Sequence, residues 1–307
     1  MGTQDTRLDN ETATFSEHRT TLFQVAYRML GSVSDTEDVL QDVWLSWASV
    51  PRDSVENPRA YLIRTTVNES LRRLGRAYKR RETYVGPWLP EPLVDAEPDA
   101  SDPTLRADEV SMALLVVLET LGPLERAVFI LRETFGYDYA EIGQVLDRSP
   151  AAVRQLAHRA REHVRARRPR FNADPTVRKE ATRRFLAAAL GGDVDALLEV
   201  LAPDVTLWTD GGGVVRAALQ VISGRDKVAR LIGALVARGG IPDFTTSDVE
   251  VNGDPGVVLH VGDEMYGVLV LELADDGEHV ENIYGVLNPD KLRDVKPDHG
   301  ETLEIPP

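Results

Sequence analysis

The chain has 307 residues, with 35 Lys and Arg against 50 Asp and Glu, so its formal net charge at pH 7 is −15. It contains no cysteine, which excludes disulfide scaffolds, thiolate zinc sites, iron–sulfur clusters and cysteine nucleophiles. No apolar run approaches the ~18 residues of a membrane span, and the first ten residues lack the apolar core of a signal peptide. We therefore expect a cytoplasmic protein of two or three domains that does not contact a membrane.

Basic residues gather in two places although the chain is acidic. Residues 85–113 hold one base and seven acids, and residues 171–307 hold 12 bases and 24 acids. One basic run lies at 72–81 and a second at 148–170. Two basic patches on an acidic chain indicate two polyanion contacts and an acidic third domain. Solvated helix faces would give the same pattern, so this reading stays open at this point.

The first 84 residues predict three helices. Apolar residues recur at helical spacing from Leu22 to Leu30. Ser34 followed by Glu37 predicts a capping box at the start of the second helix. Asn57-Pro58 predicts the start of the third, because Asn caps helices and proline suits the first helical position. Five prolines in residues 86–103 then exclude a continuous helix and predict a linker.

Residues 124–168 predict a helix-turn-helix. Asp138 and Glu141 bracket the start of the first helix, residues 147–149 form the turn, and Pro150 begins the second helix. Its inward positions are apolar: Val153, Ala157, Ala160 and Val164. Its outward positions are polar: Arg154, Gln155, His158, Arg159 and Arg161. Arg can read guanine and Gln can read adenine in the major groove, so this face predicts DNA recognition.

The pattern changes after residue 175. Helices are predicted at Pro175–Leu190, Val194–Leu201 and Arg225–Arg238. Strands are predicted at Val205–Thr209, Val214–Ile222, Thr245–Val251, Val257–Val261, Met265–Leu273 and Val280–Leu287. Helices followed by a run of antiparallel strands with short Gly and Asp turns indicate an α+β domain.

Two long blocks resemble one protein family. Residues 21–47 (TLFQVAYRMLGSVSDTEDVLQDVWLSW) and 57–81 (NPRAYLIRTTVNESLRRLGRAYKRR) resemble the second conserved region of extracytoplasmic-function sigma factors. Residues 121–162 (LGPLERAVFILRETFGYDYAEIGQVLDRSPAAVRQLAHRARE) resemble their fourth region. The resemblance implies two all-α domains, at residues 10–84 and 111–170, joined by an acidic proline-rich linker at 85–110.

The same resemblance implies binding of core RNA polymerase and promoter DNA. The second helix would bind the clamp helices of the largest polymerase subunit through Asp38, Gln41 and Asp42, and the fourth region would bind the flap region. The −10 element would be read by the third helix and the loop before it, residues 50–57. The residues implied there are Asn57, Arg64, Asn68, Arg72, Arg73, Arg76 and Arg80. The −35 element would be read by Arg154, Gln155, His158 and Arg159. We expect Trp44 and Trp47 to pack in the core.

Residues 175–295 resemble the SnoaL-like, cone-shaped α+β fold shared with ketosteroid isomerases. One subgroup of these sigma factors carries such a domain together with three short motifs. They stand here as Trp88-Leu89-Pro90-Glu91-Pro92, Asp210-Gly211-Gly212-Gly213 and Asn288-Pro289-Asp290-Lys291-Leu292, with Val214 where the subgroup has lysine.

This resemblance implies regulation in cis, with the acidic third domain folding back on the sigma domains. The residues implied are Trp88, Pro90, Glu91, Asp210, Gly211, Gly212, Gly213, Asn288, Pro289, Asp290 and Lys291. Residues 296–307 would form a tail. Whether the domain inhibits or activates stays open.

Two other functions are weighed against this one. A SnoaL-like fold encloses a pocket for a small ligand or for catalysis, and Asp210, Tyr266, Tyr284 and His260 near Trp208 are candidates to line it. Fold analogy alone is not a sign of activity. A one-component regulator that senses a ligand without polymerase is the second alternative. Because the six histidines are scattered and no Gly-rich nucleotide loop is present, we expect no metal, no cofactor and no catalytic site.

Overall fold

The structure is a computed structural model that describes residues 2–51, 55–95, 110–167, 174–238, 244–293 and 295, with the side chains of residues 2–10 and 78–80 left aside. The chain divides into two compact units. The helical unit comprises residues 1–82, 101–107 and 114–168, and the C-terminal unit comprises residues 83–100, 108–113 and 169–307. The predicted tail, residues 296–307, lies outside the described residues.

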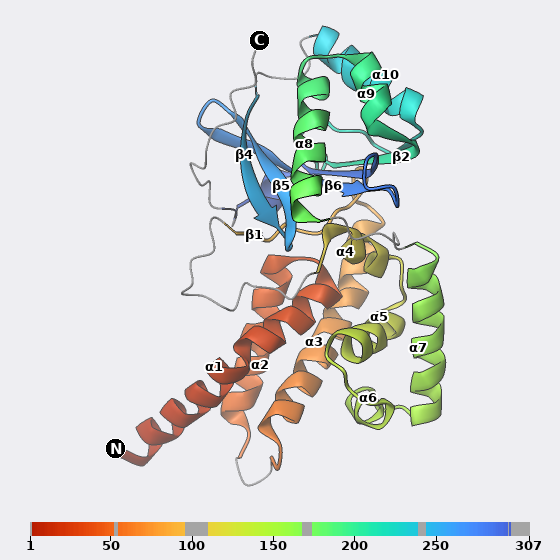
Figure 1. The fold of residues 1–307 in the computed structure, drawn as a ribbon. Helices are drawn as coiled ribbons and strands as arrows, with labels where there is room; N and C mark the ends of the chain where they lie inside the picture. The colour runs from red at the N-terminus through yellow and green to blue at the C-terminus, as the bar shows by residue number, and fades with distance from the viewer. Residues whose placement is uncertain are drawn as a thin grey trace. The chain divides into compact units, whose positions relative to one another are not determined.

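Long helices build the first part of the helical unit. The helices α1 (Gly2–Leu30), α2 (Val33–Ser49) and α3 (Pro58–Arg81) pack side by side (Figure 1). The predicted apolar stripes form their core, because Leu22, Val39, Val43 and Val67 are fully buried. Trp47 is also buried, and its indole Nε1 donates to the Glu11 carbonyl at 3.1 Å. The predicted core role of Trp47 is therefore confirmed.

Two helix starts were predicted in this part, and one is wrong. Asn57 caps α3 as expected, since its Oδ1 accepts from the Ala60 N–H at 3.0 Å. The cap of α2 is Ser32 and not Ser34, because the Ser32 Oγ accepts from the Asp35 N–H at 3.2 Å. The reason is Gly31: its left-handed φ of 64° closes α1 at once and places Ser32 in the extended conformation of a cap.

Shorter helices build the second part of the helical unit. They are α4 (Met112–Glu119), α5 (Pro123–Phe129), a π-helical turn (Ile130–Thr134), α6 (Tyr139–Leu146) and α7 (Pro150–Arg165). The predicted capping box of α6 is present: the Asp138 Oδ1 accepts from two N–H groups, and the Glu141 Oε2 accepts from the Asp138 N–H at 2.7 Å. The four predicted inward residues of α7 are all buried. The helix-turn-helix is therefore confirmed.

The turn of the helix-turn-helix needs a glycine. The Arg148 N–H donates to the Gly143 carbonyl at 2.9 Å, and a Cβ on Gly143 would lie 2.6 Å from the Arg148 oxygen. Asp147 takes the left-handed conformation, with φ of 52°. This close crossing sets the direction of α7, which Pro150 begins and the Ser149 hydroxyl caps.

The C-terminal unit is a seven-stranded sheet with helices on one face (Figure 1). The helices are α8 (Pro175–Leu190), α9 (Val194–Val200) and α10 (Arg225–Ala237). The strands are β1 (Val94–Asp95), β2 (Leu201–Asp210), β3 (Ile222–Ser223), β4 (Phe244–Val251), β5 (Asp254–Val261), β6 (Glu264–Leu273) and β7 (Val280–Val286). Their order is β1-β4-β5-β6-β7-β2-β3. One core of side chains from the three helices and from β2, β5, β6 and β7 holds the layers together, so the predicted α+β fold is confirmed.

The strand predictions for this unit need two corrections. The sheet is mixed and not purely antiparallel, because β2 pairs with β7 in parallel. The predicted strand Val214–Ile222 is mostly a loop, and only β3 at its end pairs with the sheet. The glycines explain the loop: the N–H groups of Val214 and Val215 both turn back to the Gly211 carbonyl at 3.0 Å, so neither can join a ladder.

The described part of the predicted linker is folded onto the C-terminal unit. In β1, Val94 pairs with Val251, which makes the linker the edge strand of the sheet. The Asn252 N–H donates to the Leu93 carbonyl at 2.8 Å, and the Asn252 side chain accepts from the Leu93 N–H. Residues 96–109 lie outside the described residues. Over the described ranges, none of the helices combines the length and the apolarity needed to cross a membrane.

Candidate functional site

An acidic face runs along α2. Asp38 and Gln41 are exposed and Asp42 is half-buried, as the sequence predicted for outward positions. Leu45 continues the same face, because positions i, i+3, i+4 and i+7 of a helix align. Its side chain is 59% exposed, so it is available for contact with a partner. The sequence analysis did not single out Leu45, although its spacing from Asp38 was available as a signal.

An arginine stripe runs along the outer side of α3. Its members are Arg64, Asn68, Arg72 and Arg76, four residues apart and all exposed. Arg73 lies apart from them and is half-buried, with ion pairs to Asp38 and Asp42 of α2. Asn57 is exposed and uses its side-chain oxygen as a cap. The Arg80 side chain and residues 52–54 of the preceding loop lie outside the described residues.

A polar face covers the outer side of α7. Arg154, Gln155, His158 and Arg159 are all exposed, as predicted. The Arg159 guanidinium also pairs with Glu125 of α5, with Nε 2.7 Å from Oε1, while 60% of its side chain stays exposed. Arg161 is half-buried and donates to the Tyr139 hydroxyl at 3.0 Å. Four adjacent polar side chains on one helix are thus free of the core and directed to solvent.

A buried ionic cluster, which we call the Arg126 cluster, joins the two parts of the helical unit. Arg126 of α5 is fully buried; its Nη1 donates to the Met29 carbonyl and to the Glu119 carboxylate, both at 2.7 Å. Glu119 also pairs with Arg81, whose Nη2 donates to the Leu30 carbonyl at 2.9 Å. Met29 and Leu30 end α1, where the helix dipole attracts cations. Single-sequence patterns gave no signal for this cluster.

A second buried cluster, the linker cluster, lies in the C-terminal unit and consists of Tyr84, Leu89, Asp210, Asn288 and Lys291. Asp210 is fully buried and accepts from the Tyr84 hydroxyl at 2.6 Å and from the Leu89 N–H at 2.8 Å. The Lys291 Nζ lies 2.7 Å from the Asp210 Oδ2 and also donates to the Leu89 carbonyl. Asn288 donates to the Tyr84 hydroxyl at 2.8 Å. The linker is therefore held by charge-assisted hydrogen bonds.

The three short motifs meet at this cluster. The Lys291 ammonium lies 4.0 Å from the centre of the Trp88 ring, at cation–π distance. Gly212 has φ of 61°, and a Cβ there would overlap the Asn288 amide, so only glycine fits. Pro90 is buried, Glu91 is half-buried, Gly211 is buried, and Gly213 lies beside Val85. Pro289 and Asp290 are exposed, and Asp290 pairs with Arg293.

Tyr84 is the member that the sequence analysis missed, whereas Leu89 was named within its motif but not among the regulatory residues. Burial raises the pKa of the Tyr84 hydroxyl above its ordinary value, and its hydrogen bond to the Asp210 carboxylate raises it further. The phenol therefore stays protonated and remains a donor. An aromatic residue directly before a proline-rich run was the signal available in the sequence.

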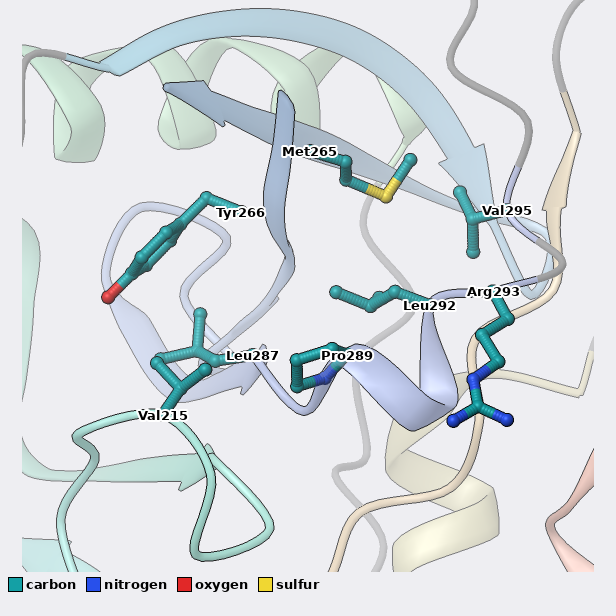
Figure 2. Close-up of a pocket in the computed structure, with 8 residues that line it drawn as sticks. All are labelled: Val215, Met265, Tyr266, Leu287, Pro289, Leu292, Arg293 and Val295. Atoms are coloured by element: carbon teal, nitrogen blue, oxygen red, sulfur yellow. The ribbon is translucent and has the colours of Figure 1, made fainter. Parts of the chain in front are cut away.

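An apolar cavity of about 280 Å³ opens in the same unit (Figure 2). Val215, Met265, Tyr266, Leu287, Pro289, Leu292, Arg293 and Val295 line it. Pro289 and Leu292 belong to the turn that also carries Lys291, so one wall of the cavity and the linker cluster share a short segment. Figure 2 shows the Met265 thioether and the Leu292 side chain directed into the space and the Arg293 guanidinium directed away.

The residues weighed for catalysis do not gather around this cavity. Only Tyr266 lines it. Asp210 is part of the linker cluster, and the His260 Nε2 lies 3.5 Å from the Ser247 hydroxyl. Trp208 and Tyr284 lie near each other, with ring centres 6.4 Å apart. Within the ranges that the structure describes, no three His, Asp or Glu side chains are grouped as a metal site requires.

Tyr284 belongs to a polar network around Glu272. The Glu272 carboxylate accepts from the Asn282 amide at 2.8 Å and from the Tyr284 hydroxyl at 3.2 Å. Burial raises the pKa of Glu272 to about 7, against the opposite effect of these hydrogen bonds. The nearby carboxylates of Glu281 and Asp254 raise the pKa of Glu272 as well. This carboxyl group is therefore partly protonated near neutral pH.

Three family models match the chain. Sigma-70 region 2 matches residues 14–80, sigma-70 region 4 matches residues 111–164, and the SnoaL-like domain matches residues 182–281. The first two matches contain the acidic face, the arginine stripe and the polar face of α7. The third contains Asp210 and most of the sheet.

Named relatives match over most of their length. The ECF RNA polymerase sigma factor SigJ of Mycobacterium tuberculosis is 41% identical over 251 residues, which are 80% of each chain. The probable ECF RNA polymerase sigma factor SigI of the same organism is 31% identical over 294 residues, covering 95% of this chain and 98% of SigI. The crystal structure of M. tuberculosis SigJ superposes with a TM-score of 0.73 at 34% identity, covering 92% of this chain and 98% of that one.

Proposed function

The chain belongs to the extracytoplasmic-function RNA polymerase sigma factors of the SigJ type, and on that premise we propose which surfaces perform each step and how the C-terminal domain regulates them. Sigma factors bind core RNA polymerase and direct initiation at promoters; they are regulators and not enzymes. The observation that carries the assignment of surfaces is the exposure of two arginine-bearing helix faces, on α3 and α7, in an otherwise acidic chain.

The acidic face of α2 contacts core polymerase. Asp38, Gln41 and Asp42 would meet the clamp helices of the largest subunit, and charge complementarity requires that partner to be basic. Leu45 adds an exposed apolar side chain at the end of this face. Because Leu45 is not part of the folded core, L45A should weaken core binding roughly tenfold with little change in melting temperature. Unchanged core affinity in L45A would contradict this assignment.

Promoter DNA lies along α3 and α7. The stripe of Arg64, Asn68, Arg72 and Arg76 fits the backbone of the −10 element, with Asn57 and the loop before it beside the separated strand. Arg80 extends the same helix. Arg154, Gln155, His158 and Arg159 enter the major groove of the −35 element. The fourth region would also contact the flap region of the polymerase.

The C-terminal domain acts in cis through the linker cluster. Residues 83–95 are the first part of the connection between α3 and the helices of the fourth region, and the Asp210–Lys291 pair and the pairing of β1 hold them on the sheet. Thirteen residues span roughly 45 Å when extended, and holding them on the sheet removes part of that length from the reach of the tether. The domain thus sets how far the two DNA-binding modules separate, in place of a separate inhibitor protein.

Run-off transcription on promoters of graded −35 to −10 spacing tests this regulation. The full chain should prefer a narrow range of spacings. K291M, and truncation after Arg170, should extend activity to longer spacings, because the tether is released; truncation after Leu292 should keep the narrow range. Identical spacing profiles for all four proteins would refute regulation through the linker.

The cavity is the proposed site for a small apolar ligand. Six of its eight lining residues are aliphatic or aromatic, the other two being Met265 and Arg293, and a wall shared with the Lys291 turn connects it to the linker cluster. Apolar cavities in proteins can bind small molecules such as benzene. Benzene should raise the melting temperature of the full chain and not that of L292W, in which the indole fills the space. No difference between the two proteins would exclude this site.

A further inference from the structure

Arg73 does not share the direction of the arginine stripe on α3. Successive residues of an α-helix are 100° apart, so Arg64, Asn68, Arg72 and Arg76 drift slowly along one side. Arg73 is turned a further 100° from Arg72, toward α2. Its side chain is 19% exposed, whereas that of Arg72 is 49% exposed. The Arg73 guanidinium is therefore less accessible to a phosphate on the stripe than that of Arg72.

The partners of Arg73 are the carboxylates of the acidic face. Its Nη1 lies 2.9 Å from the Asp38 Oδ2, and its Nη2 lies 2.8 Å from the Asp42 Oδ2. Asp35 is a third carboxylate, 3.9 Å from Nη1. The two aspartates that the guanidinium joins are one helical turn apart. A planar guanidinium with separate N–H groups fits two acceptors at that spacing, and the ammonium of lysine does not.

The charges around Arg73 explain why this arrangement persists. Burial acts to lower the pKa of Arg73, but the hydrogen bonds to Asp42 and Asp38 outweigh it and raise the pKa, so the cation is fixed. Without it, three carboxylates within two turns of α2 would repel one another. Asp38 keeps 61% of its side chain exposed, and a carboxylate accepts several hydrogen bonds. The pair therefore leaves Asp38 open to a partner protein.

We infer that Arg73 is a positioning residue of the polymerase-binding face, which holds the Asp38 and Asp42 carboxylates in place, and that it is not a DNA contact. This inference rests on the proposed role of α2 in binding core polymerase. It separates two neighbouring arginines of one helix. Arg72 pairs with Glu69 and lies 3.6 Å from the Asp42 carboxylate, but it is half exposed and serves DNA together with Arg76; Arg73 serves polymerase through α2.

The test compares R73A, R73K and R76A in the full chain, after circular dichroism has shown that each is folded. Arg76 is the matched control, because it is an exposed arginine of the same helix. Two quantities are measured: the affinity for core polymerase, and the salt dependence of binding to a mixed-sequence single-stranded 20-mer. Each lost phosphate contact lowers the slope of log K against log salt concentration by about 0.7.

R73A should weaken core binding about tenfold and leave the salt slope of DNA binding unchanged. R76A should leave core affinity unchanged and lower the salt slope by about 0.7. R73K should weaken core binding about threefold, because lysine keeps the charge but lacks the planar guanidinium whose separate N–H groups reach both aspartates. A lowered salt slope in R73A with normal core affinity would overturn the inference.

Q41A separates this inference from the assignment of the face, because Gln41 is exposed there and its contact with polymerase would not depend on Arg73. If Q41A weakens core binding and R73A does not, only the role of Arg73 is wrong. If neither variant weakens core binding, the polymerase face is misassigned and both proposals fail.

Discussion

Single buried charges decide much of the stability of the C-terminal unit. Lys291 and Asp210 are 6% and 0% exposed, and their pair holds the linker from inside. K291M should lower the free energy of unfolding by about 3 kcal/mol, because the Asp210 carboxylate stays buried without its cation. Denaturant unfolding measures this change.

The double variant D210N/K291M is the control for that measurement. It removes both charges, so part of the lost stability should return, although the one amide oxygen can replace only one of the two carboxylate oxygens that accept from Tyr84 and Leu89. If the loss of unfolding free energy in the double variant equals the sum of the losses in D210N and K291M, the two charges are not coupled.

The Glu272 carboxyl predicts a dependence of stability on pH. Its pKa is about 7 in the folded chain and near its ordinary value of 4.5 in the unfolded chain. Between those values the folded state binds more protons, so the stability that Glu272 contributes falls as the pH rises from about 4.5 to 7. The free energy of unfolding of E272Q should equal that of the original chain near pH 4 and exceed it by up to about 3 kcal/mol at pH 8.

Thermal unfolding across pH 4–8 measures the effect of E272Q. Glu264 is the matched control, because it lies on the same strand and is exposed. E264Q should follow the pH profile of the original chain. A profile of E272Q that runs parallel to that of the original chain would mean that the Glu272 carboxyl does not titrate in this range.

At the scale of single elements, α7 provides a test of base recognition. Arg154 is exposed near the start of this helix, where recognition helices contact bases, and Arg165 is 78% exposed at its end. R154A should weaken promoter binding by ~1–3 kcal/mol and relax the preference for one −35 sequence. R165A should weaken binding to all sequences equally. Binding to a library of −35 variants separates these outcomes, and a uniform loss in R154A would argue against base reading.

At the scale of the whole helical unit, the Arg126 cluster holds the two sigma modules closer together than the two promoter elements lie on DNA. The −35 and −10 elements are about 25 base pairs apart, or roughly 85 Å of duplex. A compact body of roughly 140 residues has a radius of gyration of about 15 Å, so it spans about 40 Å. The unit cannot contact both elements while Arg126 binds the end of α1. With α3 on the −10 element and α7 on the −35 element, as proposed above, we therefore predict that the two sigma modules separate before the promoter is bound.

Breaking the Arg126 cluster should favour that separation. R126A removes a buried cation from the Glu119 carboxylate and the Met29 carbonyl, which should favour the open form by several-fold or more. Because the chain has no cysteine, labels at L45C and Q155C, both exposed positions, report the distance between α2 and α7. Energy transfer should fall in R126A relative to the labelled parent. Equal transfer in the two proteins would show that other contacts hold the modules together.

The sequence predicted most elements because their signals are local. The capping box at Asp138 and Glu141 and the cap at Asn57 use residues at most three positions apart, and both are present. The failures are also instructive. Ser34 matched the capping pattern, yet Gly31 moved the cap to Ser32. Residues 214–222 have the composition of a strand, yet the glycines before them form a turn that takes their hydrogen bonds.

By itself the sequence determined the helices, their polar faces, the family and the candidate DNA-binding residues, because each depends on neighbours within a few turns of chain or on a long matching block. Only the tertiary structure decided which charges face each other. Arg72 and Arg73 are adjacent and alike in the sequence, but a rotation of 100° leaves Arg72 half exposed, with Glu69 and the more distant Asp42 as partners, and directs Arg73 to the carboxylates of α2. Tyr84, Asp210 and Lys291 meet because sheet pairing brings distant segments together. Glu119 and Arg126 form a buried cluster because the Met29 carbonyl, at the end of α1, accepts a hydrogen bond from Arg126.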